Sequence, residues 1–465
     1  MSLDTTTLQT NLTTRLAALN GSQTSEQVLS LTAAIDNLTT NRFVSVQNYT
    51  DLPNLTTTPL PSGSLVLVKQ FNIMMMSVGT QWLGIDGRSY AVPVLAQIAY
   101  AWGSDTAGEL GQGAAGYRSS PVTPTGGITN WSMLAGGIEA HTLGLAASGI
   151  LYAWGRNYGG RLGDGTTTPK SSPVTVVGGI TTWSKIAAGE GHSLGLTSGG
   201  VLYAWGYASY GRLGDNTTVN KSSPVTVVGG ITTWNQISAG KRHNLALTSA
   251  GIAYSWGYST YGRLGNDGGY GSNRSSPGTV VGGITTWSQL SAGTAHSFGL
   301  TSTGIAYAWG YNAKGELGDN SIVEKSSPVT VVGGITTWSQ LSGGRDPIGA
   351  WSTGAGHSLG LTSGGVVYAW GGAINGRLGD GTTVSKSSPV TVVGGITNWN
   401  KIAAGGEHNL ALTSAGIAYA WGKNAAGQLG DGSTVDKSSP VTVVGGITTW
   451  SQIFTGRKHS LGLKT

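Results

Sequence analysis

The chain alternates large apolar residues with small or polar ones over short stretches, and this alternation returns about every 51 residues. In 192–197, His, Leu and Leu alternate with Ser, Gly and Thr; in 201–206, Val, Tyr and Trp alternate with Leu, Ala and Gly. A period of two places the large side chains on one face of a strand. A β-branched run such as 173–177 and a stretch such as 180–187 complete the unit. Each unit therefore predicts four short strands, and no helical apolar spacing occurs in the repeats.

Three phrases mark the repeat, and each occurs seven times: Tyr-Ala-Trp-Gly or a close variant, Gly-Gly-Ile-Thr-x-Trp, and a strand that opens with histidine. A period of this length is typical of solenoids, arrays and propellers. The tryptophans of both phrases predict a core dominated by aromatic burial, because each buries about 150–250 Å². The histidines are His141, His192, His243, His296, His357, His408 and His459.

The order of the phrases predicts how the array ends. The first copy, 99–103, has no histidine strand before it, and the last copy, 459–463, has no Trp-Gly strand after it. The two halves are complementary, so joining the chain ends completes one sheet. An open stack would leave two unpaired edges, whereas a ring of four-stranded blades leaves only short, protected edges. We therefore expect an all-β fold, a closed seven-bladed β-propeller over residues 93–465.

The repeat resembles that of a known family. The phrases His-Ser-Leu-Gly-Leu-Thr-Ser-x-Gly and Tyr-Ala-Trp-Gly-x-x-x-x-Gly-Arg-Leu-Gly-Asp are similar to the repeat of the regulator of chromosome condensation family. The resemblance implies a seven-bladed propeller closed by joining the two chain ends. The kelch propeller has a similar period and stays a minor alternative, because its tyrosine and tryptophan are spaced differently. The family's nucleotide exchange on a small GTPase is not supported, since the expected acidic and histidine contact residues are not matched.

The first 92 residues differ from the repeats. Residues 1–40 predict two short amphipathic helices, a helical segment for oligomerisation and attachment. Neither helix is long enough to be stable alone in water, so each needs a partner. Self-association is the favoured source, with a trimer preferred; docking on the propeller or partial disorder is the alternative. The apolar seam consists of Leu12, Leu16, Leu19, Val28, Leu31, Ile35 and Leu38, preceded by Leu8.

A connector and a small β module are expected in residues 41–92. The stretches 64–69, 72–78 and 81–85 predict a three-strand meander. Three strands are close to the minimum for a sheet that stands alone. The segment 49–88 resembles small β modules in appendage proteins of bacterial viruses. That resemblance implies a tail fibre or adhesin, a function that the propeller by itself does not name.

Composition excludes several classes of protein. Charged residues make up 10% of the chain, and the net charge of +6 is spread without a long Lys/Arg run, so nucleic-acid binding is not expected. No cysteine is present, which excludes disulfides and thiol chemistry. No secretory signal and no apolar run of membrane-spanning length is visible.

Most candidate catalytic residues belong to the repeat itself. The seven histidines are spread around the predicted ring, whereas the ligands of one metal must converge, so we expect a buried, hydrogen-bonded structural role. A ring of histidines around a channel is the lesser alternative. No nucleophile–base pair and no specific phosphate loop is found. The sequence therefore predicts a protein that is not an enzyme, with no metal and no cofactor. The same structural reading applies to Asp164, Asp215, Asp319, Asp380 and Asp431.

The loop before each histidine, which we call the pre-histidine loop, is the first candidate for recognition. In the fifth unit it is ten residues longer and carries Arg345, Asp346 and Trp351. Long loops in compact repeats are usually functional or disordered, and insertions often map to the binding face. The alternative is a tolerated insertion whose tryptophan covers the propeller. In other units the same loop varies in charge, with Lys241, Arg242, Arg457 and Lys458 as the basic candidates.

The turn after each Trp-Gly, which we call the post-tryptophan turn, is the second candidate. It carries Tyr207, Tyr210, Tyr258 and Tyr261, which are concentrated in neighbouring units. These rings are suited to stack on sugars or to grip a protein. Packing between neighbouring blades is an equally good interpretation.

These observations favour a structural and adhesion protein on the exterior of a bacterial virus. Its N-terminal region would join like chains and other virion proteins, and its propeller would contact a glycan or protein of the host surface. A soluble bacterial propeller that binds or inhibits a protein partner is the alternative. Neither interpretation involves membrane insertion or nucleic acid.

Overall fold

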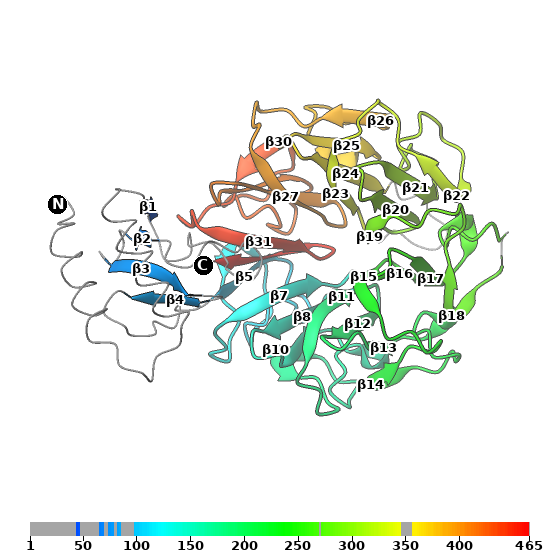
Figure 1. Ribbon diagram of the computed structural model, residues 1–465, viewed down its shortest axis with the longest axis horizontal. Helices are drawn as coiled ribbons and strands as arrows, with labels where there is room; N and C mark the ends of the chain where they lie inside the picture. The colour runs from blue at the N-terminus through cyan, green and yellow to red at the C-terminus, as the bar shows by residue number, and fades with distance from the viewer. Residues whose placement is uncertain are drawn as a thin grey trace. The chain divides into compact units, whose positions relative to one another are not determined.

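The computed structural model describes residues 97–268, 271–345 and 356–464, together with four strands of the N-terminal part (Figure 1). The chain divides into two compact units, Met1–Leu95 and Ala96–Thr465, and each is described by itself. The predicted helical segment 1–40, with its apolar seam, lies outside the described residues.

The N-terminal unit contains one four-stranded sheet in the order β1-β2-β3-β4. The last three strands form an antiparallel meander at the positions expected from the sequence. The first strand adds a parallel pairing, with Phe43 opposite Leu65, which the sequence does not predict because eighteen residues separate the two strands. The strands are β1 (Phe43–Val46), β2 (Leu65–Val68), β3 (Ile73–Val78) and β4 (Gln81–Gly84).

The second unit is a β-propeller of seven four-stranded antiparallel blades (Figure 1). The first strand of each blade starts at the tryptophan of Gly-Gly-Ile-Thr-x-Trp and lines the central channel. These inner strands are β7 (Trp131–Gly136), β11 (Trp183–Ala188), β15 (Trp234–Ala239), β19 (Trp287–Ala292), β23 (Trp338–Gly343), β27 (Trp399–Ala404) and β31 (Trp450–Thr455). The second strands start at the histidines and are β8 (His141–Ala146), β12 (His192–Thr197), β16 (His243–Thr248), β20 (His296–Thr301), β24 (His357–Thr362), β28 (His408–Thr413) and β32 (His459–Lys464).

The two outer strands of each blade flank the post-tryptophan turn. The third strands are β5 (Ile98–Gly103), β9 (Leu151–Gly155), β13 (Leu202–Gly206), β17 (Ala253–Gly257), β21 (Ala306–Gly310), β25 (Val367–Gly371) and β29 (Ala418–Gly422). The fourth strands are β6 (Arg118–Val122), β10 (Lys170–Thr175), β14 (Lys221–Thr226), β18 (Arg274–Thr279), β22 (Lys325–Thr330), β26 (Lys386–Thr391) and β30 (Lys437–Thr442). Short 3-10 turns are η2 (Tyr158–Gly160), η3 (Ser209–Gly211), η4 (Thr260–Gly262) and η5 (Ile374–Gly376).

The two ends of the propeller close it in one blade. Its strand order is β31-β32-β5-β6, so the last two strands of the chain pair with the first two of the propeller. The pairing is antiparallel, with His459 opposite Gly103 and Leu463 opposite Ala99. In the ring, β31 also lies against β7. The seven-bladed propeller closed by joining its chain ends is therefore confirmed.

Tryptophans hold neighbouring blades together. The tryptophan of every Trp-Gly phrase is fully buried, and its indole nitrogen donates to a backbone carbonyl of the preceding blade, as from Trp205 to Arg161 over 3.0 Å. The tryptophan of the inner strand packs edge to face on the tyrosine of its own blade, as in Trp183 and Tyr203, whose ring centroids lie 5.4 Å apart. Such aromatic pairs stabilise a core beyond their buried area. The predicted aromatic core is therefore present in every blade.

The seven histidines form a circle of links between blades, which we call the histidine belt. Nε2 of each histidine meets the side chain that follows the histidine in the next blade, as from His192 to Asn244 over 2.7 Å. Asn244 in turn donates to the carbonyl of Arg212. The last link, from His459 to Thr142 over 3.3 Å, closes the circle. The other five links are His141–Ser193, His243–Ser297, His296–Ser358, His357–Asn409 and His408–Ser460.

Burial keeps the histidine belt neutral. Loss of solvent lowers the pKa of His192, His296, His357 and His408 to about 3, and that of His459 to about 4. An imidazolium without water or a carboxylate partner is disfavoured, which is the usual effect of a buried site. The structural role expected for these histidines is therefore what the contacts show.

The repeated aspartates serve the turn before the fourth strand. Asp164 accepts hydrogen bonds from the backbone and hydroxyl of Thr166, and its carboxylate lies 3.7 Å from Lys170 Nζ. The same aspartate–lysine pair recurs in four other blades, as Asp215–Lys221, Asp319–Lys325, Asp380–Lys386 and Asp431–Lys437. A side chain that bonds its own turn is typical of aspartate, so these residues shape loops rather than a catalytic site.

Candidate protein-binding face

The two variable zones of the sequence meet on one face of the propeller. In each blade the histidine pairs with the glycine that ends the third strand, as His192 does with Gly206. The residue after that glycine then bonds the pre-histidine loop: the amide of Tyr207 donates to the carbonyl of Gly191 over 2.8 Å. Pre-histidine loops and post-tryptophan turns therefore lie side by side, although more than ten residues separate them in the chain.

Tyrosines and arginines gather on this face over three consecutive blades, those that begin with β7, β11 and β15. They line a hollow of about 550 Å³. We call this cluster the tyrosine–arginine face. Around the hollow it comprises Glu139, Arg156, Tyr158, Arg161, Glu190, Tyr207, Tyr210, Arg212 and Arg242. We include four neighbours that contact it or continue the series in the third blade: Lys241, Tyr258, Tyr261 and Arg263.

Guanidinium groups and phenol rings alternate along this face. The guanidinium carbon of Arg212 lies 5.9 Å from the ring centroid of Tyr207 and 5.8 Å from that of Tyr210. Arg242 also contacts the ring of Tyr210, with its guanidinium carbon 5.5 Å from the ring centroid. The rings of Tyr210 and Tyr258 are 4.4 Å apart between centroids, which carries the series into the next blade. Cation–π contacts of this kind fix both partners in place.

Two carboxylates organise the cations without neutralising them. Glu190 lies 3.1 Å from Arg242, 3.6 Å from Arg212 and 3.6 Å from Lys241. Glu139 pairs with Arg161 at 2.9 Å. The cluster holds six cationic groups and two carboxylates, so it keeps a positive excess. Burial lowers the pKa of Arg212 and Arg263 to about 10, which leaves both charged at neutral pH.

Two tyrosines of the face adopt a backbone conformation that L residues rarely take. Tyr210 has φ 65° and Tyr261 has φ 68°. The equivalent positions in sister turns hold Gly159 and Asn375, the residue types that tolerate this region. A left-handed conformation costs roughly 1–2 kcal/mol for other residues. Strain of this kind is concentrated at functional sites, so the two tyrosines point to recognition rather than folding.

The structure sorts the predicted recognition residues into different environments. Tyr207 and Tyr210 are 41% and 37% exposed and line the hollow, as does Arg242. Lys241 is only 6% exposed and forms an ion pair with Glu190, so its side chain is too buried to contact a partner. Tyr258 and Tyr261 stack over Arg263, which combines blade packing with partial exposure.

The remaining predicted residues do not join this cluster. Arg457 and Lys458 occupy the pre-histidine loop of the closing blade and do not line the hollow. Arg345 extends into the central channel rather than onto an open surface. Asp346 and Trp351 lie outside the described residues.

Sequence reasoning missed the arginines of the Gly-Arg-Leu-Gly phrase, because they look like part of the scaffold. These arginines are Arg161, Arg212 and Arg263. Arg161 forms an ion pair with a carboxylate, and tyrosine rings lie against Arg212 and Arg263. The sequence did contain an indication that this position serves recognition, because it holds Glu in two repeats and Gln in one. A position that changes charge while its neighbours stay constant is not dictated by the fold.

Within the part of the chain that the structure describes, no three side chains of His, Cys, Asp or Glu come together as metal ligands would. In the same residues, no helix has the length and apolar character needed to span a membrane.

Known proteins share this fold and repeat. The RCC1-like domain family matches residues 98–462. The ultraviolet-B receptor UVR8 of Arabidopsis thaliana is 31% identical over 365 residues, which covers 76% of this chain and 79% of UVR8. The human E3 ubiquitin-protein ligase HERC2 is 32% identical over 367 residues, but that match spans only 7% of HERC2.

A solved structure agrees with the sequence relatives on the fold. Prp20p of Saccharomyces cerevisiae, whose crystal structure is described with its binding properties to Gsp1p and histones, superposes with a TM-score of 0.68 at 21% identity. The match covers 80% of this chain and 92% of that one. With the matched domain spanning nearly the whole propeller, this chain belongs to the RCC1-like domain family.

Proposed function

We propose that this chain is a non-enzymatic regulatory propeller that binds an acidic segment of a protein partner on its tyrosine–arginine face. The observation that carries the proposal is the clustering of six cations and five tyrosines over three adjacent blades of one face. Tyr and Arg are the residues that most often dominate binding energy at protein interfaces. The positive excess selects for carboxylates on the partner.

The geometry reduces the entropy lost on binding. Arg212 contacts two rings, those of Tyr207 and Tyr210, and Arg242 contacts both Tyr210 and Glu190. Side chains that are already fixed lose little freedom when a partner arrives, and preorganisation increases affinity for that reason. The exposed tyrosines then add large contact areas at low entropic cost.

The relatives support protein binding as the general function. Prp20p is described with its binding properties to Gsp1p and histones. This statement concerns Prp20p, and it favours the alternative drawn from the sequence, a propeller that binds a protein partner. The virion adhesin, its trimeric assembly and its exterior location depend on residues 1–92. Apart from four strands, that part lies outside the described residues.

A pair of charge reversals tests the face. Arg242→Glu places a carboxylate in the hollow beside Glu190, whereas Lys458→Glu makes the same change at the matching position of the closing blade. The full chain carrying a photo-crosslinking residue at position 207 is used to identify the partner and its contacting peptide by mass spectrometry. Binding of that peptide is then measured by calorimetry at two salt concentrations.

The expected result is an acidic peptide whose affinity falls at least about tenfold with Arg242→Glu and stays within about twofold with Lys458→Glu, as loss of a charged hydrogen bond predicts. Higher salt is expected to weaken binding to the parent chain. Equal losses in both variants, or a crosslinked peptide rich in Lys and Arg, would contradict the proposal.

A further inference from the structure

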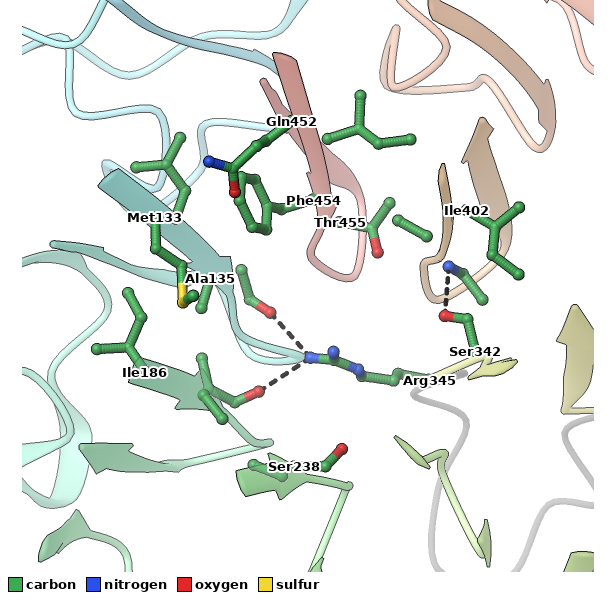
Figure 2. Close-up of a pocket in the computed structure, with 18 of the residues that line it drawn as sticks. Met133, Ala135, Ile186, Ser238, Ser342, Arg345, Ile402, Gln452, Phe454 and Thr455 are labelled. Carbon is green, nitrogen blue, oxygen red and sulfur yellow. Dashed lines mark hydrogen bonds between the residues drawn. The ribbon is translucent and has the colours of Figure 1, made fainter. Parts of the chain in front are cut away.

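The inner strands of the propeller enclose a cavity of about 310 Å³ on the central channel (Figure 2). Its wall combines small residues with a few large apolar ones, among them Met133, Ile186 and Ile402. Phe454 also faces this cavity, at a position where the inner strands β7, β11, β15, β23 and β27 carry only alanine or serine. The channel is therefore narrowed on one side by an aromatic ring that the repeat does not require.

Arg345 enters this cavity from the end of β23. Its Nη1 donates to the carbonyl of Gly136 over 3.2 Å and to that of Ala188 over 3.0 Å, and Figure 2 shows both bonds crossing to other blades. Its backbone amide donates to the carbonyl of Gly405 over 2.8 Å. Two other blades thus hold the guanidinium group, and a third holds the backbone from which it extends, which a merely tolerated surface loop would not need.

Among the described residues, the cavity wall offers no acidic counterpart to the charge of Arg345. The lining residues that the structure describes are apolar, neutral or cationic, and the second cation, Lys401, donates to the carbonyl of Ser451 over 2.7 Å. Nε of Arg345 is buried and has no acceptor among the described residues. Burial lowers the pKa of Arg345 to about 10, so it stays charged at neutral pH. A buried charge without a counter-ion is strongly disfavoured.

We propose that the central channel binds a small organic carboxylate, whose charged end pairs with the Nε–Nη2 edge of Arg345. Nη1 is already used by two carbonyls, and the remaining edge presents two parallel N–H donors, the geometry that matches a carboxylate. The apolar body of the ligand would lie against Phe454 and Ile186. A cavity lined by apolar residues and a few convergent polar groups, with one fixed guanidinium among them, is typical of a small-molecule site.

The test uses the purified full chain and sodium butyrate as probe, with butyramide as the uncharged analogue of the same shape. Butyrate is expected to raise the melting temperature in a saturable way and to give a heat of binding by calorimetry, whereas butyramide is expected to do neither. Sodium phosphate serves as the inorganic anion. A signal with phosphate and none with butyrate would overturn the carboxylate assignment.

Two substitutions locate the site, and a third is the control. Arg345→Gln is expected to abolish the butyrate signal. Arg345→Lys keeps the charge without the paired donors, and we expect binding to weaken about tenfold or more, in line with the value of one charged hydrogen bond. Arg457→Gln, at the matching position of the closing blade and outside the cavity wall, is expected to leave binding unchanged. Unchanged binding in a folded Arg345→Gln or Arg345→Lys variant would overturn the proposal.

Discussion

The seams between blades and the tyrosine–arginine face use the same repeat in opposite ways. At every seam a carbonyl of one blade accepts the tryptophan nitrogen of the next, whichever side chain that residue carries. On the tyrosine–arginine face, the side chain of that same residue forms the contacts with tyrosine rings and carboxylates. The backbone therefore holds the ring together, which leaves the side chain free to diversify.

One repeat position shows both roles. It is arginine in four blades, with Arg161, Arg212 and Arg263 consecutive, and it is Glu109, Glu316 or Gln428 in the others. The carbonyl of Glu316 still accepts from Trp370 over 2.9 Å. Its carboxyl group is buried without a paired arginine, and burial raises its pKa to about 7. The same repeat position therefore carries a cation in some blades and a buried carboxyl group in another, although the blades share one fold.

Acidification is expected to weaken the histidine links between blades before it changes the charges of the tyrosine–arginine face. The histidines take up protons in the unfolded state below a pKa of about 6.5, whereas burial lowers the folded-state pKa of all seven, to about 3 for His192 and to about 4 for His459. Stability is therefore complete above pH 6.5 and falls as the pH drops, by roughly 1.4 kcal/mol per pH unit for each histidine. Melting temperatures between pH 8 and pH 4 measure this loss.

Two buried carboxyl groups partly offset the loss of stability at low pH, and including them gives the net number of protons taken up on unfolding. The pKa of Asp105 is raised to about 6 and that of Glu316 to about 7, mainly by burial, so the folded state holds these protons more tightly. Unfolding at pH 5.5 is then expected to take up about five protons in net terms. A melting temperature that does not change between pH 7 and pH 4.5 would contradict the neutral histidine belt.

Two aromatic residues that are two positions apart compare the seam and the face directly. Trp205→Ala removes a fully buried ring and its bond to the preceding blade, so we expect a loss of about 3–5 kcal/mol in the free energy of unfolding. Tyr207→Ala truncates a ring that is 41% exposed, and we expect a change of about 0.5 kcal/mol. Denaturant titration gives both values, and similar losses would remove the distinction.

The close contact of glycine with the histidine belt gives a third comparison. A Cβ at Gly189 would overlap the ring of His192, so Gly189→Ala is expected to cost about 1–3 kcal/mol by overpacking. Gly199 lies in an open turn where a Cβ has room, and Gly199→Ala is expected to change stability by about 0.5 kcal/mol or less. The free energy of unfolding of each variant decides; equal effects would argue against a tightly packed belt.

A reciprocal exchange measures the strain of the face. Tyr210→Asn places a residue tolerant of φ 65° in the turn, and we expect stability to stay level or rise by up to about 1 kcal/mol while partner binding falls. Asn375→Tyr imposes the same conformation on a tyrosine in another blade and loses a hydrogen bond to Asp436, so a cost of about 1 kcal/mol or more is expected. If Tyr210→Asn destabilised the protein by more than 1 kcal/mol, the tyrosine would be structural.

The sequence by itself determined the ring. Alternation of large and small residues is a local property, and it placed the strands of every blade, from β5 to β32. The complementary ends, 99–103 and 459–463, determined the closure because half a blade at each end has only one way to complete its hydrogen bonds. Even spacing favoured a structural role for the histidines, since the catalytic groups that act on one substrate are usually asymmetric, whereas these residues recur at equal steps around a ring.

Only the tertiary structure decided how loops from different blades combine. Glu190 and Arg242 are 52 residues apart, and their contact depends on the angle between neighbouring blades, which no local pattern encodes. The same holds for Lys241, which is buried and pairs with Glu190 of the preceding blade, and for Arg345, whose side chain is held in the channel by carbonyls of two other blades. Strand patterns set each blade because their hydrogen bonds are local, whereas the site needed the packing of whole blades to bring its side chains together.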